Sequence, residues 1–144
     1  MLLFSWKVSV MYAPEWMFDQ AKVIAGEIVN SQDRGLIIQM YRGKLELTQE
    51  ELSHIMRLRR ETISRIEHGK VTPTLTFIHT FSGIVTLMEA VKSYRSMNRA
   101  VEHLYFIRIG AELGVPRDNV VSIVDTAIMN YEKKRKKAIR YLER

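Results

Sequence analysis

The sequence predicts an all-α fold, and three observations support this prediction. Only three prolines and seven glycines interrupt the 144 residues. Between them, nearly every window repeats apolar residues at a spacing of three to four, which is the period of a helix face. Residues that start and stop helices stand at the ends of these windows. The exception is segment 2–12, where a short extended arm and a helical turn fit equally well.

The N-terminal part begins with two expected helices. Pro14 suits the first turn of a helix that closes at Asn30 and Ser31. A second helix from about Asp33 should stop at Gly43, because glycine readily takes the left-handed conformation that closes a helix.

Segment 47–70, LTQEELSHIMRLRRETISRIEHGK, predicts two short helices joined by a tight turn. Thr48 and Glu51 have the spacing of a capping box, so the first helix begins there. Ser53 is small enough to let the two helices approach each other, and Gly69 ends the second one. The expected apolar contacts between them come from Leu52, Met56, Leu58, Ile63 and Ile66. Two short helices joined by so few residues must cross steeply, which is the helix-turn-helix plan.

Three further helices are expected in the C-terminal part. Thr72 and Pro73 read as a cap followed by proline at the first helical position, opening a helix that continues through Met88. The next helix should span residues 97–113 and end at the Gly-Val-Pro sequence 114–116. The last should run from about 118 to 142 and carries the basic sequence EKKRKK. This cluster either touches a DNA backbone or solvates an exposed helix.

Composition and charge narrow the classes of function. The formal net charge is +6, with 22 Lys and Arg against 16 Asp and Glu, and the sequence pI is about 9.7. Such an excess favours an anionic partner, either nucleic acid or a membrane surface. No apolar run approaches the roughly 18 residues of a membrane-spanning helix. The start MLLFSWKVSV lacks the pattern of a secretory signal, so we expect a soluble cytoplasmic protein.

Metal binding and catalysis are not expected. The absence of cysteine excludes a disulfide framework and a thiolate zinc site. The histidines show no ligand spacing; they are His54, His68, His79 and His103. No phosphate loop, nucleophile elbow or pair of catalytic acids stands out. Glu50 and Glu51 are explained by their place at a helix start. We therefore predict no enzyme activity and no cofactor.

Segment 47–70 resembles the helix-turn-helix of the XRE family, the group of phage lambda repressor and Cro. The resemblance rests on LTQEEL, on TISRIEHGK and on the Pro-x-Leu sequence at Pro73 to Leu75, and it covers about residues 33–90. It implies a five-helix lambda-repressor-like DNA-binding domain at residues 32–92. Residues 1–31 would form an N-terminal arm and helix, and residues 93–144 a C-terminal helical extension that is a candidate for dimerisation.

The second short helix is the expected reading helix for double-stranded DNA. A recognition helix enters the major groove by its N-terminal end. On a helical wheel, Ile63 and Ile66 point inward and the polar residues point outward. The predicted base contacts are Arg60, Glu61, Ser64 and Arg65. The predicted phosphate contacts are Thr48, Gln49, Arg57, Arg59, His68 and Lys70. Arg42 and Glu67 occupy positions that resemble the internal salt bridge of the family.

Two residues depart from the family pattern. Arg57 stands where the family usually has glycine, and Arg59 where it usually has serine or threonine. A non-glycine residue in a left-handed turn costs about 1 kcal/mol or more, and a lost cap about 1 kcal/mol. Either these arginines improve phosphate binding, or the turn has a different geometry, or they only form a solvated face.

Repressors of this type generally bind two half-sites as symmetric homodimers. Two apolar regions could pair the subunits: residues 1–30, and the stripe Val120, Val124, Ala127, Ile128 and Tyr131. The alternative is that both complete a monomeric core. Segment 109–124, IGAELGVPRDNVVSIV, repeats the apolar spacing of the first motif. It is either a second, degenerate helix-turn-helix with Arg117, Asp118 and Asn119 outward, or an ordinary connection.

The predicted function is that of a sequence-specific transcriptional regulator, and the pattern favours a repressor over an activator. The alternative is a protein-interaction module, such as an antitoxin or a coactivator, in which residues 93–144 hold a partner. No effector can be inferred from the residues.

Overall fold

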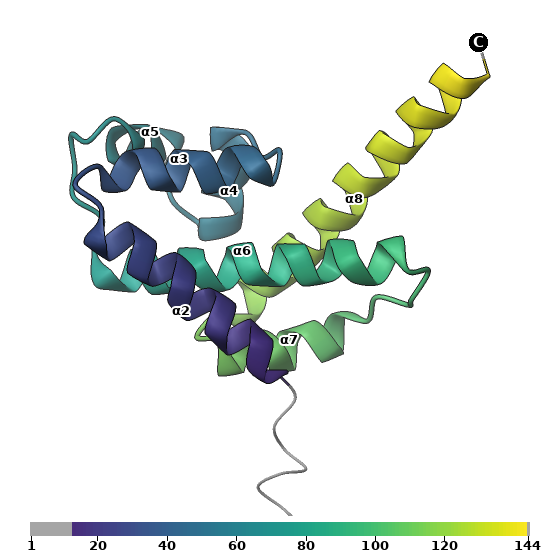
Figure 1. The fold of residues 1–144 in the computed structure, drawn as a ribbon, viewed down its shortest axis with the longest axis horizontal. Helices are drawn as coiled ribbons and strands as arrows, with labels where there is room; N and C mark the ends of the chain where they lie inside the picture. The colour runs from purple at the N-terminus through teal and green to yellow at the C-terminus, as the bar shows by residue number, and fades with distance from the viewer. Residues whose placement is uncertain (1–12, 144) are drawn as a thin grey trace, which may run out of the picture.

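The computed structural model describes residues 13–143, and in this range the chain is all-helical, as predicted (Figure 1). The helices are α2 (Glu15–Asn30), α3 (Arg34–Lys44), α4 (Gln49–Met56), α5 (Arg60–Glu67), α6 (Leu75–Ser96), α7 (His103–Glu112) and α8 (Arg117–Leu142). Segment 2–12, for which an extended arm or a helical turn was expected, lies outside the described range. Every helix in the described part is too short or too polar to span a bilayer.

Helix α6 forms the centre of the molecule. Most of its residues between Phe77 and Val91 are buried, so it is covered on nearly all sides. A helix that is apolar all round needs such a position. Helices α2 and α8 pack on it from different directions, and α7 packs mainly on α8. Residues from all seven helices and their connections contribute to one continuous apolar core.

Helices α3, α4 and α5 form a lobe on one side of this central helix (Figure 1). The lobe also contacts α8, whose N-terminal half packs on α4 as well as on α6. The C-terminal half of α8 then leaves the body of the protein and projects beyond it, beside the lobe. Its last buried residue is Ala127.

Three predicted helix boundaries are wrong. Gly43 lies inside α3, which continues to Lys44, and the left-handed residue after the helix is Glu46 with φ 58°. The cap of α6 is Thr74, not Thr72, because the Thr74 hydroxyl accepts the Phe77 N–H at 3.0 Å. Pro73 therefore precedes the cap instead of opening the helix.

The helix predicted from residue 97 begins only at His103. Helix α6 continues to Ser96 and is closed by Asn98, which takes the left-handed conformation at φ 57°. The Arg99 N–H donates to the Tyr94 carbonyl oxygen at 2.9 Å, and its guanidinium lies over the Tyr94 ring. Asparagine is the commonest substitute for glycine at this position, so Asn98 is the stop signal that the prediction overlooked.

The apolar stripe on α8 is not available for dimerisation. Val120, Val124 and Ala127 are fully buried within the chain, and Ile128 packs against the same core. The reason is that α6 presents a matching apolar surface to α8. The stripe completes the monomeric core, which is the alternative considered above.

Candidate nucleic-acid interface

Helix α4 begins with the predicted capping box. The Thr48 hydroxyl accepts the N–H of Glu51 at 3.0 Å, and the Glu51 carboxylate accepts the N–H of Thr48 at 3.0 Å. These two bonds satisfy donors that the first turn of a helix leaves without partners. The N-terminus of this eight-residue helix is therefore fixed in place.

The turn after α4 has the left-handed geometry that glycine usually supplies. Arg57 adopts φ 57° and ψ 41°, and the next residue, Leu58, donates its N–H to the Ser53 carbonyl oxygen at 3.0 Å. Arg59 stands at the N-cap of α5 and makes no side-chain cap bond. The backbone geometry is thus conventional, although an L side chain in this conformation costs about 1 kcal/mol.

Helix α5 has one buried and one exposed face. Ile63 and Ile66 are buried, while Glu61 and Arg65 are exposed and Ser64 is half-buried. Arg60, at the first position of the helix, is also exposed. The polar face of α5 therefore points to solvent, as a helix that enters a DNA groove requires.

A buried ion pair joins α3 to the end of α5. The Arg42 guanidinium donates to both carboxylate oxygens of Glu67, at 2.7 and 2.9 Å, and also to the Leu47 carbonyl oxygen at 2.7 Å. The Glu67 side chain is 0% exposed and the Arg42 side chain 15%. The bonds to Glu67 raise the pKa of Arg42 above its ordinary value. This pair holds α5 against α3.

Hydrogen bonds connect the Glu67 carboxylate to two of the predicted DNA-contacting residues. Gln49 donates its side-chain amide to Glu67 at 3.1 Å, and its amide oxygen accepts the Arg60 guanidinium at 3.3 Å. The predicted phosphate contact Gln49 and the predicted base contact Arg60 are therefore held side by side. The structure thus links the N-termini of α4 and α5 into one surface.

Gly35 is a site residue that the sequence analysis missed. A Cβ atom at this position would overlap the backbone carbonyls of Ile66 and Glu67. Helix α3 therefore approaches the end of α5 through backbone contact, which only glycine permits. A glycine inside an otherwise regular helix was the available signal.

The other predicted phosphate contacts have different surroundings. Arg59 and Lys70 are exposed. His68 is also exposed, and its Nδ1 atom lies 2.7 Å from the Ser64 carbonyl oxygen. Arg57 points toward α8, where its guanidinium lies 3.6 Å from the Asp118 carboxylate in an exposed ion pair. A phosphate would have to compete with Asp118 for Arg57.

Asn119 is buried, which corrects the expectation that it points outward. Its side-chain amide donates to the Ile55 carbonyl oxygen at 2.8 Å. This carbonyl belongs to the last turn of α4, where helix carbonyls lack partners within the helix. Asn119 therefore caps α4 and docks the first turn of α8 on the helix-turn-helix lobe. The contact joins residues 64 positions apart, so local sequence gave no signal for it.

The bend between α7 and α8 repeats the geometry of the bend between α4 and α5. Gly114 is left-handed at φ 80°, and the Val115 N–H donates to the Gly110 carbonyl oxygen at 2.7 Å, as Leu58 does to Ser53. Ile109, Val115, Val120 and Ile123 are buried. The start of α8 nevertheless faces α4, through Asn119 and Asp118. The surface that a second reading helix would turn to DNA is therefore partly covered.

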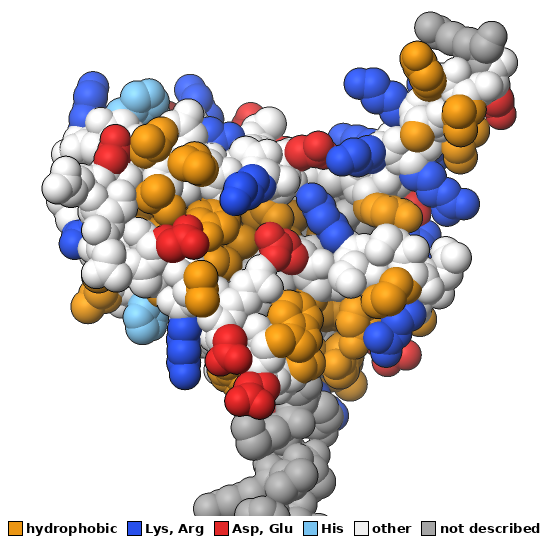
Figure 2. All heavy atoms as spheres, viewed as in Figure 1, with side chains coloured by type: hydrophobic (Ala, Val, Ile, Leu, Met, Phe, Trp, Pro, Cys, Tyr) orange, Lys and Arg blue, Asp and Glu red, His pale blue; other side chains and the backbone are white. Residues whose placement is uncertain are grey.

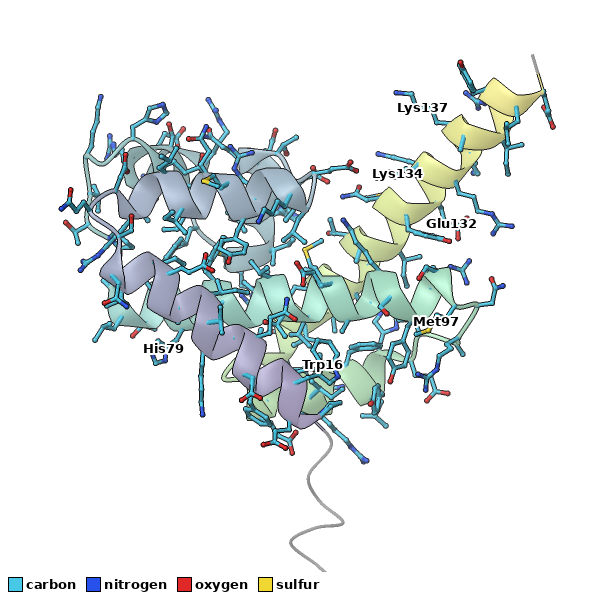
Figure 3. The ribbon with its side chains drawn as sticks, viewed as in Figure 1. Trp16, His79, Met97, Glu132, Lys134 and Lys137 are labelled. Carbon is cyan, nitrogen blue, oxygen red and sulfur yellow. The ribbon has the colours of Figure 1, made fainter. Side chains whose placement is uncertain are left out.

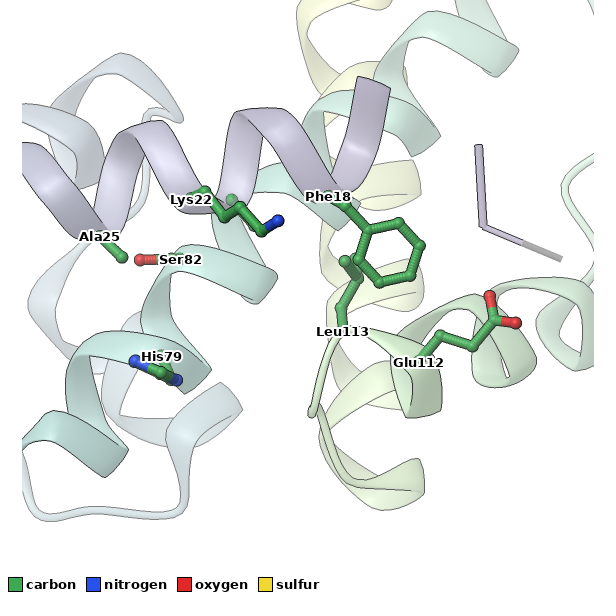
Figure 4. Close-up of a pocket in the computed structure, with 8 residues that line it drawn as sticks. Phe18, Lys22, Ala25, His79, Ser82, Glu112 and Leu113 are labelled. Carbon is green, nitrogen blue, oxygen red and sulfur yellow. The ribbon is translucent and has the colours of Figure 1, made fainter. Parts of the chain in front are cut away.

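A separate hollow of about 320 Å³ lies between α2, α6 and the end of α7 (Figure 4). Its wall is mainly apolar, and the side chains of His79 and Glu112 stand at opposite sides of it. The Glu112 carboxylate accepts the backbone N–H of Ala13. Among the described residues there is no cluster of three or more His, Asp or Glu side chains that could hold a metal ion.

Lys and Arg side chains stand along the upper edge of the α3–α5 lobe and along the projecting part of α8 (Figure 2). Residues 38–80, from α3 into α6, match the sequence model of the family described as helix-turn-helix. No curated protein and no solved structure matches the chain. The matched segment contains α4, the turn and α5 in full, so the similarity and the observed geometry agree.

Proposed function

We propose that this chain, which carries a DNA-binding helix-turn-helix domain of the XRE family, regulates transcription by reading double-stranded DNA in a sequence-specific way. The observation that carries the proposal is the exposed polar face of α5, held beside the N-terminus of α4 by Gln49. Helix α5 enters the major groove by its N-terminal end, and the N-terminus of α4 meets the phosphate backbone.

The proposed roles follow from the chemistry of each side chain. Arg60 and Arg65 can donate two hydrogen bonds to the O6 and N7 atoms of guanine. Glu61 can accept the amino group of cytosine, and Ser64 can serve as donor or acceptor. The phosphate contacts come from residues around this face; they are Thr48, Gln49, Arg57, Arg59, His68 and Lys70.

We further propose that the protein acts as a repressor and as a homodimer. A domain seated in the groove excludes other proteins from the same DNA without needing a contact to them. One eight-residue helix offers few base contacts, so a second copy on a half-site about 34 Å away supplies the missing specificity. Trp16 and Val23 on α2 remain exposed and fall in the region 1–30 predicted for pairing.

The test is a selection of bound fragments from random DNA at physiological salt, followed by titration of the selected duplex. Arg65→Ala should relax the base preference at one position and weaken the selected duplex by about 1–3 kcal/mol. Lys70→Ala should weaken selected and unrelated duplexes alike and lower the salt dependence by about one phosphate contact. A palindromic selected site would support the dimer.

The two variants control for each other, because both remove one exposed positive charge. The reverse pattern, with Lys70→Ala changing the base preference, would overturn the assigned roles. Failure of the wild-type protein to enrich any duplex would overturn the function itself.

A further inference from the structure

The C-terminal half of α8 is the strongest charged feature that the helix-turn-helix does not use. Six of the eight residues 133–140 are Lys or Arg, and none is acidic. Every side chain from Lys133 to Glu143 is exposed. Because this end of α8 does not pack on the core, packing does not explain why its residues are so basic.

The row of cations has two sides, and they face different parts of the molecule. Lys134 and Lys137 point toward the α3–α5 lobe, whereas Glu132 points the opposite way (Figure 3). The Glu132 carboxylate binds Arg95 of α6, and the positive charges of Arg95, Arg135 and Lys136 lower its pKa. Arg135 and Lys136 therefore belong to the side away from the lobe.

Lys134 is placed directly beside the candidate DNA interface. Its ammonium group lies 3.2 Å from the Glu46 carboxylate. Glu46 is in the turn just before Thr48, which caps the α4 N-terminus. From there, Gln49 connects to Arg60 on the reading helix. A phosphate backbone that meets the N-terminus of α4 thus passes next to Lys134.

The spacing along α8 suits a run of phosphates. A helix rises 1.5 Å per residue, so Lys134 and Lys137 are about 4.5 Å apart along the axis. One DNA strand carries a charge for each rise of about 3.4 Å. Neighbouring phosphates can therefore each meet one lysine. The exposed pair with Glu46 is of the weak kind, so a phosphate can replace it.

The groove between α6, α8 and the α3–α4 turn holds further donors. It has a volume of about 480 Å³, and Lys92 and Asn130 are among the residues that line it. The side-chain nitrogen of Asn130 is buried and has no hydrogen-bond acceptor among the described residues. The lining carries two lysines, Lys92 and Lys134, against one carboxylate, Glu46, so its net charge favours an anion at this edge of the interface.

We propose that the α8 face containing Lys134 and Lys137 binds the phosphate backbone of the same DNA duplex that the α4–α5 surface reads. This inference rests on the proposed function and deepens it, since it adds a second contact from the C-terminal extension. A duplex is favoured over a membrane surface because the lysines face the helix-turn-helix lobe and adjoin the α4 N-terminus. The contact carries no base information, so it raises affinity without changing sequence preference.

The experiment compares two double variants with the same loss of charge. Lys134→Gln with Lys137→Gln alters the face toward the lobe, and Arg135→Gln with Lys136→Gln alters the opposite face. Binding of a selected duplex with flanking DNA is titrated over a range of salt concentrations. The first variant should bind about tenfold more weakly or worse at physiological salt, and its salt slope should fall by nearly two. The second should lose less than half as much.

Equal effects of both variants, or no effect of either, would overturn the inference, because the charges would then act diffusely or only solvate the helix. Binding to phosphatidylglycerol vesicles is measured in parallel. Loss of vesicle binding in the first variant with unchanged duplex binding would also overturn it and indicate a membrane surface. If the wild-type protein binds no duplex, both the proposed function and this inference are overturned. If the first variant binds the duplex as well as the wild type does, only this inference is overturned.

Discussion

The two bends of the molecule, α4–turn–α5 and α7–turn–α8, share a backbone plan and differ in what surrounds their second helix. In the first, α5 keeps a polar face open to solvent and is tied to α3 by the Arg42–Glu67 pair. In the second, α8 is covered by apolar contacts with α6, and its Asn119 caps the last turn of α4. The same local geometry thus leaves an exposed polar face in one place, where we propose that DNA is read, and forms a structural joint in the other.

The difference teaches that the helix-turn-helix shape alone does not define a DNA-binding site. Similar apolar spacing and the same turn hydrogen bond produce the bend twice, but α5 keeps an exposed polar face, whereas the start of α8 is docked on α4 through Asn119. The outward residues and the packing partners decide the role. Substitutions that remove the Arg42–Glu67 pair or the Asn119 cap one at a time should show how far the stability of each bend depends on the other.

The largest effect is expected from Glu67→Ala. It leaves the Arg42 guanidinium partly buried without its carboxylate, and removal of one partner from such a pair costs about 3–5 kcal/mol in free energy of unfolding. Urea denaturation measures the loss. Glu132→Ala is the matched control, because it removes the carboxylate partner of Arg95 at the exposed end of α8 and should cost far less. Equal losses would contradict the special place of the buried pair in the first bend.

A smaller effect is expected from Asn119→Ala, which separates the second bend from the first. The variant leaves the Ile55 carbonyl oxygen buried without its donor, a change that costs about 1–3 kcal/mol in free energy of unfolding. Ser122→Ala, one turn later on α8, removes only a hydroxyl bonded to its own helix and serves as the control. An unchanged stability of Asn119→Ala would show that α8 does not depend on this cap for its position on the lobe.

The helices and the first bend follow from local chemistry, and so the sequence predicts them well. The Thr48–Glu51 capping box and the inward Ile63 and Ile66 depend on neighbours within a few residues. The geometry of the turn at Arg57 stayed open in the sequence, and the structure shows it to be left-handed. The helix boundary near residue 97 failed because Asn98 took the role that was expected only of glycine.

Contacts between distant segments could not be predicted in the same way. The burial of Asn119 depends on a carbonyl group 64 residues earlier, and the burial of the α8 stripe depends on α6. Neither partner can be identified from the local sequence, because an apolar stripe has the same residue pattern whether it packs on its own chain or on another copy. The pairing of Arg42 with Glu67 could be expected only because a family pattern supplied the distant partner.

The smallest effect is expected at the two left-handed turn positions, and it should have opposite signs in the two bends. Arg57→Gly relieves the strain of a side chain at φ 57° and should raise the free energy of unfolding by up to about 1 kcal/mol. Gly114→Ala introduces that strain at φ 80° and should lower the free energy of unfolding by about 1 kcal/mol. Thermal and urea unfolding of both variants measure the two changes.

Arg57→Ala separates backbone strain from charge, because it removes the guanidinium and keeps a side chain in the left-handed conformation. If strain dominates, Arg57→Ala stays close to the wild type while Arg57→Gly gains stability. If the ion pair with Asp118 dominates, both variants lose stability together. The duplex affinity of the same two proteins then measures what the Arg57 guanidinium contributes to DNA binding. If Arg57→Gly is more stable but binds the duplex more weakly, the first bend tolerates backbone strain because its cation binds phosphate. The second bend has glycine at the equivalent position and no such contact to maintain.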